Sequence, residues 1–307
     1  MITLLGYYGF GTLGDELLLQ ACIERLGKHN EIIVLSNNPE ETRKNFGVEA
    51  VNRWRYREVI KALRKSEALY LGGGGLFQDV TSVKSCVWYW LIVRLAKFLG
   101  LKVFALGQSI GPLNSRLSRL LTANALRACE RVEVRDENSY NVAKTLGCKN
   151  VLQTCDLVFS LAPGNPVKRA SLYTLINLRP CENLDSFVDV IAPNVAKLTG
   201  EKIGVALSEE DEKILEALRE KLTLSKIVRV KTLNEAKSLW EKASEAVGMR
   251  LHFGVLSVIF RVPVALMPYD IKVSELAKQF NIPCIAHEWQ GPKIPDVIKF
   301  AHEQAQD

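Results

Sequence analysis

Short apolar runs alternate with longer amphipathic stretches along almost the whole chain, and this alternation is what most restricts the fold. The short runs have the length and composition of buried strands, whereas the stretches between them carry the apolar stripe of a helix. Strands that are joined by helices run parallel. The pattern therefore predicts α/β sheets that are covered by helices on both faces.

The expected strands are Ile2–Gly6, Glu31–Leu35, Ala68–Leu71, Lys102–Leu106, Arg131–Arg135, Leu172–Asn177, Lys202–Leu207, Ala246–Gly248 and Val262–Met267. The expected helices are Asp15–Lys28, Trp54–Lys65, Val83–Leu99, Leu117–Cys129, Glu137–Leu146, Phe253–Phe260 and Val273–Phe280.

The length of 307 residues suits two domains of ordinary size. The segment Leu161–Pro166 holds two prolines and a glycine and is the best linker candidate. We therefore expect a Rossmann-like N-terminal domain over 1–163 and a Rossmann-like C-terminal domain over 164–290. A C-terminal helix over 291–307 would pack back on the N-terminal domain. Two such sheets would bind ligands at the carboxyl ends of their strands, in a cleft between the domains.

The charge balance favours anionic partners such as phosphates, lipid diphosphates or an acidic membrane leaflet, because the net charge is +6 and the pI about 8.9. No dense Lys/Arg run is interleaved with exposed aromatics, so a nucleic-acid partner is not expected.

The cysteine number, 7, is odd and no CxxC occurs, which indicates buried thiols in a reducing compartment. We find no signal-peptide pattern, and the longest apolar run, Cys86–Val93, is too short for a membrane span. The sequence predicts a cytoplasmic protein.

Three glycine-bearing loops follow expected strands. The first, Gly9–Gly14, fits a dinucleotide-binding pattern. However, Asp15 and Glu16 stand at the start of the next helix, where they would repel a pyrophosphate, and Ser36–Asn38 replaces the acid that binds ribose. Nicotinamide binding is therefore not expected, and a tight turn with acids that stabilise the helix is an equal alternative to a functional role.

The second loop, Gly72–Gly75, is more informative because four glycines allow a ligand or another backbone to approach closely. Gln78 and Asp79 follow it as candidate polar contacts. The third loop, Gly107–Pro112, contains Gln108 and Ser109. Parallel strands end at one edge of their sheet, so the three loops should line that edge.

Cations and a histidine also follow expected strands. In an extended segment Arg250 and His252 would share one face, and Lys272 follows the next strand. Arg135 ends a strand of the first domain. Such a set suits a small anion with several charges. The alternatives are a structural histidine and cations that are simply solvated.

These motifs together resemble the polysaccharide pyruvyl transferases, in particular the bacterial type that acts on secondary cell-wall polymers. The resemblance runs from about residue 3 to 285. It rests on Gly6–Gly9, Leu13–Glu16, Gly72–Gly75, Gln78-Asp79, Gly107–Pro112, Arg135-Asp136, Ser139, Asp156, Gly248–His252, Tyr269-Asp270 and Lys272. One departure is Thr12, where the family usually has Asn.

The resemblance implies a GT-B-like fold of two Rossmann-like domains, with the acceptor on the N-terminal side and the donor on the C-terminal side. It implies phosphoenolpyruvate as the donor, a ketal-linked pyruvate on a sugar as the product, and no metal or other cofactor. The usual acceptor is a lipid-diphosphate-linked saccharide that contains N-acetylmannosamine, so a peripheral contact with the inner membrane leaflet is expected. The residues that match the catalytic positions are His252, Arg135 and Lys272.

We also expect residues of these loops, from both domains, to contact the two substrates. The expected donor-binding residues are Arg250, Gly248, Leu251, Gly74, Gly75, Gln108 and Ser109. The expected acceptor-binding residues are Gly11, Thr12, Asp15, Glu16, Gln78 and Asp79. In this interpretation Arg135, Arg250 and Lys272 bind the anion, and His252 protonates the methylene carbon of the donor as a general acid.

Two surfaces are candidates for the membrane contact. One is Trp54–Arg57 with Lys61, Arg64 and Lys65, and the other is Trp88–Trp90 with Arg94 and Lys97, whose rings are better explained by packing on the sheet. Two other functions stay open. One is a GT-B glycosyltransferase with a nucleotide-sugar donor. In that case Glu209–Asp211 would bind the ribose of the nucleotide. The other is a non-catalytic polysaccharide-binding protein.

Overall fold

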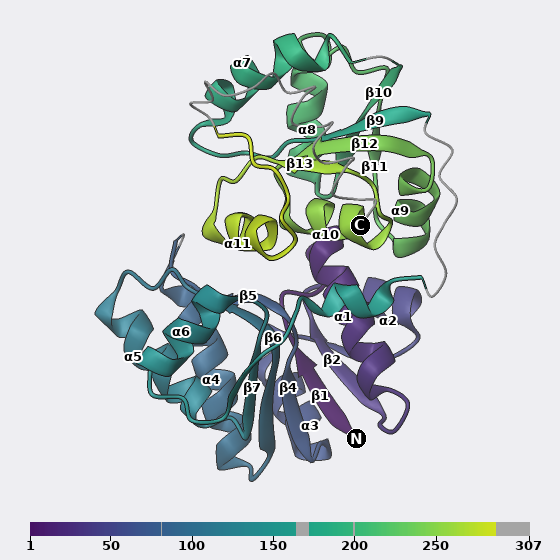
Figure 1. Ribbon diagram of the computed structural model, residues 1–307. Coiled ribbons are helices and arrows are strands. Elements are labelled where there is room, and N and C mark those ends of the chain that lie inside the picture. Colours follow the sequence, from purple (N-terminus) through teal and green to yellow (C-terminus); the bar gives the residue numbers. More distant parts are fainter. Residues whose placement is uncertain (81, 164–171, 199, 287–307) are drawn as a thin grey trace. The chain divides into compact units, whose positions relative to one another are not determined.

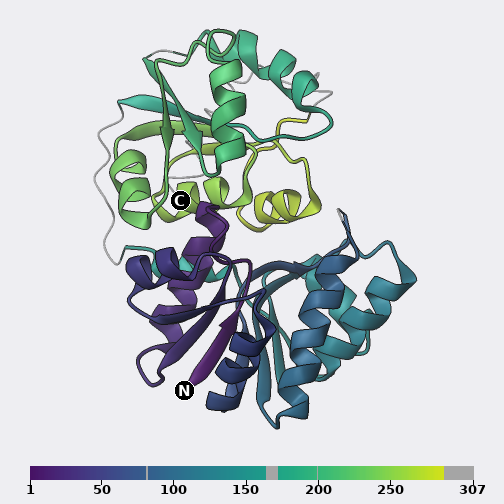
Figure 2. The same cartoon turned by 180° about the vertical axis from the view of Figure 1, so that it is seen from behind.

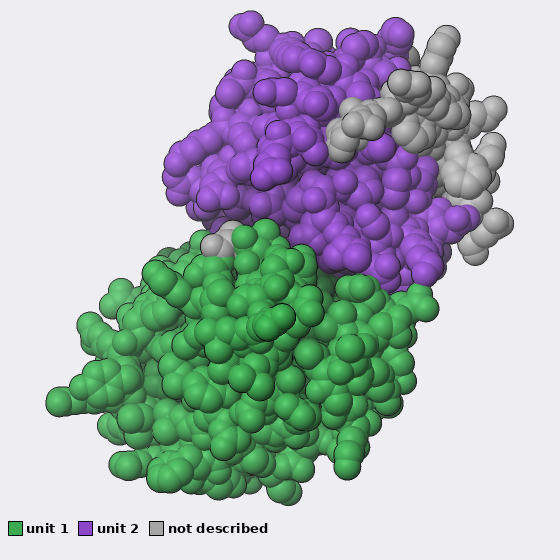
Figure 3. All heavy atoms as spheres, turned by 90° about the vertical axis from the view of Figure 1, so that its left-hand side faces the viewer, with its two compact units in different colours: residues 1–10, 15–161 green, residues 11–14, 162–307 purple. Residues whose placement is uncertain are grey.

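The computed structural model describes residues 1–80, 82–163, 172–198 and 200–286. The chain divides into two compact units, one of Met1–Phe10 with Asp15–Leu161 and one of Gly11–Gly14 with Ala162–Asp307 (Figure 3). We call them unit 1 and unit 2. The expected linker covers Leu161–Pro166, of which residues 164–166 lie outside the described residues. The C-terminal helix expected over 291–307 also lies outside them.

Unit 1 is built on a parallel sheet whose main path has the strand order β3-β2-β1-β4-β6-β7-β8, with β5 paired to β6 (Figure 1). Its strands are β1 (Ile2–Leu5), β2 (Ile32–Ser36), β3 (Glu49–Asn52), β4 (Ala68–Leu71), β5 (Gly74–Phe77), β6 (Lys102–Ile110), β7 (Arg131–Val134) and β8 (Val151–Gln153). From β1 the chain first adds β2 and β3 on one side, and then β4 and the later strands on the other. The switch point between β1 and β4 is where open α/β sheets bind ligands.

The helices of unit 1 are α1 (Leu13–Leu26), α2 (Pro39–Phe46), α3 (Tyr56–Lys65), α4 (Lys84–Phe98), α5 (Arg116–Arg127) and α6 (Glu137–Thr145), and a 3-10 turn covers Leu157–Leu161. Several begin at residues that satisfy the first backbone N–H groups. Asn38 accepts from the Glu41 N–H at the start of α2, where Pro39 supplies a fixed φ, and Asp136 accepts from the Ser139 N–H at the start of α6. Helices cover both faces of the sheet (Figures 1 and 2).

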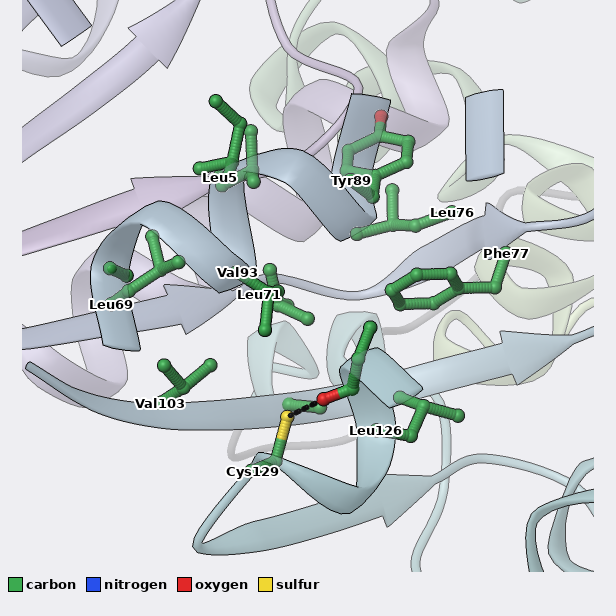
Figure 4. Packing of buried hydrophobic residues seen from close by; sticks show 14 of the residues in the cluster. Leu5, Leu69, Leu71, Leu76, Phe77, Tyr89, Val93, Val103, Leu126 and Cys129 are labelled. Atoms are coloured by element: carbon green, nitrogen blue, oxygen red, sulfur yellow. Dashed lines mark hydrogen bonds between the residues drawn. The ribbon is translucent and has the colours of Figure 1, made fainter. Parts of the chain in front are cut away.

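The core of unit 1 lies between this sheet and its helices. Leu5 from β1, Leu71 from β4, Phe77 from β5 and Val93 from α4 are all fully buried and converge in one cluster (Figure 4). Each such side chain contributes roughly 1.5–3 kcal/mol relative to leaving it exposed. The core fixes the positions of the strand ends, and the loops that follow those ends carry the polar residues of the candidate site.

Unit 2 repeats the architecture with a smaller parallel sheet of order β11-β10-β9-β12-β13. Its strands are β9 (Tyr173–Asn177), β10 (Glu201–Ala206), β11 (Lys226–Arg229), β12 (Ala243–Gly248) and β13 (Val264–Leu266). Its helices are α7 (Leu184–Val195), α8 (Glu209–Ala217), α9 (Leu233–Trp240), α10 (Leu251–Ile259) and α11 (Ile271–Gln279). Ser208, Thr232 and Asp270 cap α8, α9 and α11. The switch point of this sheet lies between β9 and β12.

The structure corrects the expected limits of one loop. Residues Gly107–Ile110 were expected to form a loop after a strand that ends at Leu106, but they extend β6 to Ile110. The Ile110 N–H donates to the Ser139 hydroxyl, and Gly74 pairs with Gln108 across β5 and β6. The extra strand β5 supplies a partner for the segment after Leu106, which continues the strand through an irregularity at Gly107, where φ is +54°.

Candidate functional site

The carboxyl edge of the sheet of unit 2 carries a group of cations and a histidine. Arg179 follows β9, Arg250 and His252 follow β12, and Lys272 lies in the first turn of α11 after β13. Asn177 at the end of β9 holds this edge together. Its side chain accepts from the Arg250 N–H at 2.9 Å and donates to the Val205 carbonyl at 2.9 Å.

Arg250 is bound to a buried carboxylate rather than projecting alone. Its Nε donates to both carboxylate oxygens of Asp211 at 3.1 Å, and its Nη2 donates to the Ser208 hydroxyl at 2.9 Å. Burial disfavours the charged guanidinium, but the hydrogen bonds and charge of Asp211 outweigh that effect and raise the pKa of Arg250 above its ordinary value. This contact also engages Asp211, one of the acids that could bind a nucleotide ribose.

His252 lies in the first turn of α10 and packs against Gly14, the last residue of the first glycine loop. The Gly14 α-carbon faces the imidazole so closely that a Cβ there would overlap the ring. The Leu13 N–H donates to the Leu207 carbonyl at 2.9 Å, which fastens the same loop beside β10. Residues 11–14 belong to the same compact unit as His252. The structure thus brings together two motifs that are far apart in the sequence.

Lys272 is half-buried and pairs with Asp270, whose Oδ2 lies 3.1 Å from its Nζ. The backbone of Lys272 also donates to Asp270 Oδ1 at 3.1 Å, because Asp270 is the N-cap of α11. The ion pair holds the ammonium group near the N-terminal end of the helix.

Arg179 is a cation of this edge that was not predicted from the sequence. Its guanidinium stacks on the ring of Tyr269 at 4.3 Å from the centroid, and its Nη1 donates to the Tyr269 hydroxyl at 2.7 Å. No acidic side chain forms an ion pair with it in the described part of the chain. The signal was present in the sequence, since Arg179 comes two residues after the expected strand Leu172–Asn177.

The remaining expected donor residues of unit 2 serve packing and helix formation. Gly248 faces the ring of Phe253, which leaves no room for a Cβ. Leu251 is buried and begins α10, and the side chain of its N-cap, Arg250, makes no capping hydrogen bond. The first N–H groups of this helix and the positive end of its dipole therefore suit an anion.

In unit 1, Arg135 is buried at the end of β7. Its Nη1 donates to Asp156 Oδ2 at 2.8 Å, and its Nε lies 3.9 Å from Asp136 Oδ2. Ser109 joins the network, with its hydroxyl 3.3 Å from Asp136 Oδ2. Arg135 and Ser109 are thus brought together with two carboxylates at one end of the sheet.

Gln108 is fully buried, and its amide nitrogen lies within 3.2 Å of the carbonyls of Leu71, Gly72 and Leu106. These contacts tie β6 to the end of β4. The amide nitrogen therefore supports the second glycine loop, Gly72–Gly75, and the donor contact expected of Gln108 stays a prediction.

The four positions after β4 hold glycine for different physical reasons. A Cβ on Gly72 would overlap the hydroxyl of buried Tyr8, and one on Gly73 would crowd Leu18. Gly74 has a φ of +106°, which L side chains rarely adopt. Gly75 is exposed, and no atom lies within 4 Å of the position of its missing Cβ. Close packing explains the first two, and Gly75 offers backbone that a ligand can reach.

The expected acceptor residues fall into two groups. Asp79 accepts from the Asn114 and Ser115 N–H groups at 2.7 Å, and Gln78 accepts from the Val80 N–H at 2.8 Å, so both shape their own loops. Burial would raise the pKa of Asp79, but these hydrogen bonds prevail and lower it.

The other group lies around the first glycine loop. Gly11 is exposed, Thr12 directly precedes α1, and the Asp15 carboxylate is 3.7 Å from the position of a Cβ on Gly74. Glu16 accepts from the Gly9 N–H at 2.8 Å. Burial, and secondarily the nearby Asp15 and Glu41, raise its pKa to about 7 although the Gly9 hydrogen bond opposes the shift. Glu16 can therefore exchange a proton near neutral pH.

Among the described residues, no three His, Cys, Asp or Glu side chains gather closely enough to hold a metal ion. No helix in the described part of the chain combines the length and apolar character that a membrane span requires.

Solved structures with the same fold include enzymes of the GT-B type. They include MurG from Acinetobacter baumannii (TM-score 0.56, 12% identity, 99% of this chain and 94% of that one). UDP-GlcNAc 2-epimerase from Neisseria meningitidis bound to UDP-GlcNAc gives a TM-score of 0.62 at 12% identity over 99% and 94% of the two chains. Anabaena Alr3699/HepE in complex with UDP-glucose gives a TM-score of 0.67 at 11% identity, over 100% of this chain and 91% of that chain. The fold is therefore GT-B-like, with two Rossmann-like units, as the sequence predicted.

A family model described as polysaccharide pyruvyl transferase matches residues 13–271. The match covers most of the chain, including Arg135, His252 and Arg250. The chain belongs to the polysaccharide pyruvyl transferase family, which confirms the resemblance drawn from the motifs. A search of curated proteins finds no match.

Proposed function

We propose that the protein transfers pyruvate from phosphoenolpyruvate onto a sugar of a lipid-linked polysaccharide precursor as a ketal. The observation that carries this proposal is the gathering of Arg179, Arg250, His252 and Lys272 at the carboxyl edge of unit 2, beside the uncapped start of α10. Phosphoenolpyruvate carries a phosphate and a carboxylate. Cations and helix N–H groups are suited to both anionic groups.

The chemistry assigns a role to each group. His252 donates a proton to the methylene carbon, which becomes the methyl group of the product. One sugar hydroxyl adds to the central carbon and a second one displaces phosphate from it, so both oxygens end on that carbon. One of the two hydroxyl protons returns to His252, and the other leaves with the phosphate. The cations stabilise the negative charge that the departing phosphate develops.

The test is phosphate release from phosphoenolpyruvate, with and without a lipid-linked or aryl-tagged disaccharide that contains N-acetylmannosamine. Release that depends on the acceptor, with a product heavier by one ketal-linked pyruvate, would support the proposal. His252→Gln should abolish release and leave the thermal shift by phosphoenolpyruvate largely intact. His29→Gln removes an exposed histidine of unit 1 and is the matched control.

The two alternatives predict different results. A nucleotide-sugar glycosyltransferase would release nucleotide from its donor and ignore phosphoenolpyruvate. Of the acids expected at its ribose contact, Asp211 is bound to Arg250 and Glu209 pairs with Lys213 at 2.7 Å. A non-catalytic polysaccharide-binding protein would bind the disaccharide and release nothing from either donor.

For the membrane contact we propose the outer face of α4 and α5, which pack against each other. Both helices lack Asp and Glu, and their cations are Lys84, Arg94, Lys97, Arg116, Arg119 and Arg127. Exposed apolar side chains stand on the same helices, namely Leu91, Phe98, Leu117 and Leu120. Apolar side chains among cations favour an anionic bilayer surface. The rings of Trp88–Trp90 contribute less to this face, since Tyr89 is buried and Trp90 donates to Asn124 of α5.

Vesicle flotation tests this surface. The protein should float with phosphatidylglycerol vesicles and not with phosphatidylcholine vesicles. The double variant Phe98→Ser/Leu120→Ser should lose flotation, whereas Leu152→Ser, at an exposed apolar position on β8, should keep it. Equal flotation of both variants would contradict the assignment.

A further inference from the structure

A buried arginine in unit 1 is enclosed by aromatic rings. Arg53 follows β3 and is only 2% exposed. Its guanidinium carbon lies 5.1–5.7 Å from the centroids of four rings, those of Phe10, Trp54, Trp88 and Tyr89. We refer to Arg53, these four residues and Tyr7 as the aromatic cluster.

Two N–H donors of the cluster have no hydrogen-bond acceptor among the residues that the structure describes. Arg53 donates through Nη1 to the Gly6 carbonyl at 2.6 Å and through Nη2 to the Tyr89 hydroxyl at 3.3 Å. Its Nε and the Nε1 of Trp88 are buried without an acceptor among the described residues. No carboxylate within the described residues pairs with Arg53. Buried donors normally find an oxygen acceptor, and a cation without a counter-charge favours oxygen-rich groups.

The outer rings of the cluster are exposed and held in place. Trp54 is 56% exposed, and its indole N–H donates to the Asn37 side chain at 2.8 Å. Asn37 in turn donates to the Gly9 carbonyl at 3.2 Å. Tyr7 is 44% exposed and stacks on Phe10 with the centroids 3.9 Å apart. Rings that are already ordered lose little entropy when a ligand stacks on them.

The position of the cluster agrees with a binding role. Its residues come from the loops after β1 and β3 and from α4, and Asn37 comes from the loop after β2. These loops lie at the carboxyl edge of the sheet, on the β1 side of the switch point, where α/β sheets receive ligands. Trp54 and Tyr7 therefore offer exposed rings at an edge of the sheet that can receive a ligand.

We infer that the aromatic cluster is a saccharide-binding platform, on which one sugar ring of the acceptor stacks against Trp54 and Tyr7. The apolar C–H face of a pyranose matches an aromatic face, and the rings of Trp54 and Tyr7 are exposed and already ordered. This inference rests on the proposed function, because it assigns the acceptor of that reaction to named residues. It also gives Trp54 a role other than the membrane contact expected from the sequence.

The test is a direct binding measurement without phosphoenolpyruvate. The methyl glycoside of a disaccharide that contains N-acetylmannosamine is titrated into wild-type protein and variants by calorimetry, so that no aryl tag can stack on the rings. Trp54→Ala should weaken binding by about 10-fold or more, and Tyr7→Ala should also weaken it. Tyr56→Ala removes an aromatic ring that is 67% exposed on α3 but outside the cluster, and it should bind as wild type does.

Two results would overturn the platform. One is a wild-type protein that does not bind the disaccharide at millimolar concentration. The other is unchanged binding by both Trp54→Ala and Tyr7→Ala. The phosphate-release assay separates this failure from that of the proposed function. Binding that depends on Trp54 without phosphate release would keep the platform and reject the donor, and phosphate release without such binding would do the reverse.

Discussion

The imidazole of His252 lies directly against the α-carbon of Gly14, and only a residue without a Cβ leaves room for the ring. Gly14 is the second residue of α1 and the last glycine of the first glycine loop. From the sequence, this loop could equally be a functional element or a simple turn. In the structure Gly14 leaves the space that the imidazole of His252, the proposed general acid, occupies.

Gly14→Ala should reduce kcat by about 10-fold or more, because the added methyl group displaces the imidazole from its position. The variant should still fold, since the roughly 0.5–1 kcal/mol by which alanine is favoured over glycine in a helix offsets part of the roughly 1–3 kcal/mol that the crowded side chain costs. Steady-state phosphate release and thermal melting test the two statements together. Full turnover with an unchanged KM would show that the contact does not position His252.

Asp211→Asn should strongly destabilise unit 2, because Asp211 is fully buried and is the ion-pair partner of Arg250. Removing one partner of a buried pair leaves an uncompensated charge and costs roughly 3–5 kcal/mol. Urea unfolding measures the loss. Glu210→Gln, at the exposed neighbouring position, is the control. If the two variants unfold at the same urea concentration, the pair is not a structural support of this edge.

Much of the fold followed from the sequence because the strands are buried on both faces. All four residues of β1 and all five of β2 are buried, so apolar composition alone located them. Strand β11 was missed because its sequence, KIVR, is half polar and none of its residues is fully buried. Helices α2 and α8 were missed because they are rich in charged residues and each buries only one or two side chains.

The candidate site was predictable only in part. Spacing placed Arg250, His252 and Lys272 after neighbouring strands, and these strands do end at one edge of the sheet. Two of these side chains contact residues that are distant in the sequence, Asp211 for Arg250 and Gly14 for His252, whereas Lys272 pairs with the nearby Asp270. The same applies to the aromatic cluster, since Phe10, Arg53 and Trp88 meet only through the order of the strands.

Arg179→Met should raise the KM for phosphoenolpyruvate by about 10-fold or more, with little loss of stability. Arg179 stacks on Tyr269 and forms no ion pair in the described part of the chain, so its charge remains available to a carboxylate or a phosphate. Hydrogen bonds to charged groups contribute about 1.5–3 kcal/mol, which corresponds to this change in KM. Arg219→Met, at an exposed arginine after α8, controls for the loss of a positive charge in unit 2. An unchanged KM would remove Arg179 from the donor site.

Glu16→Gln should make the protein more stable than wild type at pH 8 and about equally stable at pH 4. Burial raises the pKa of Glu16 from 4.5 to about 7, so the folded state holds this proton more tightly than the unfolded state. The free energy of unfolding contributed by the protonated group is fully present below pH 4.5 and is lost as the pH rises through about 7, which amounts to about 3 kcal/mol. Glutamine keeps an oxygen for the Gly9 N–H and cannot ionise, so it avoids this loss. Urea midpoints at several pH values measure the difference, with Glu24→Gln on the same helix as the control for removing a carboxylate. Parallel pH profiles of wild type and Glu16→Gln would mean that Glu16 ionises in the folded protein as readily as in the unfolded chain.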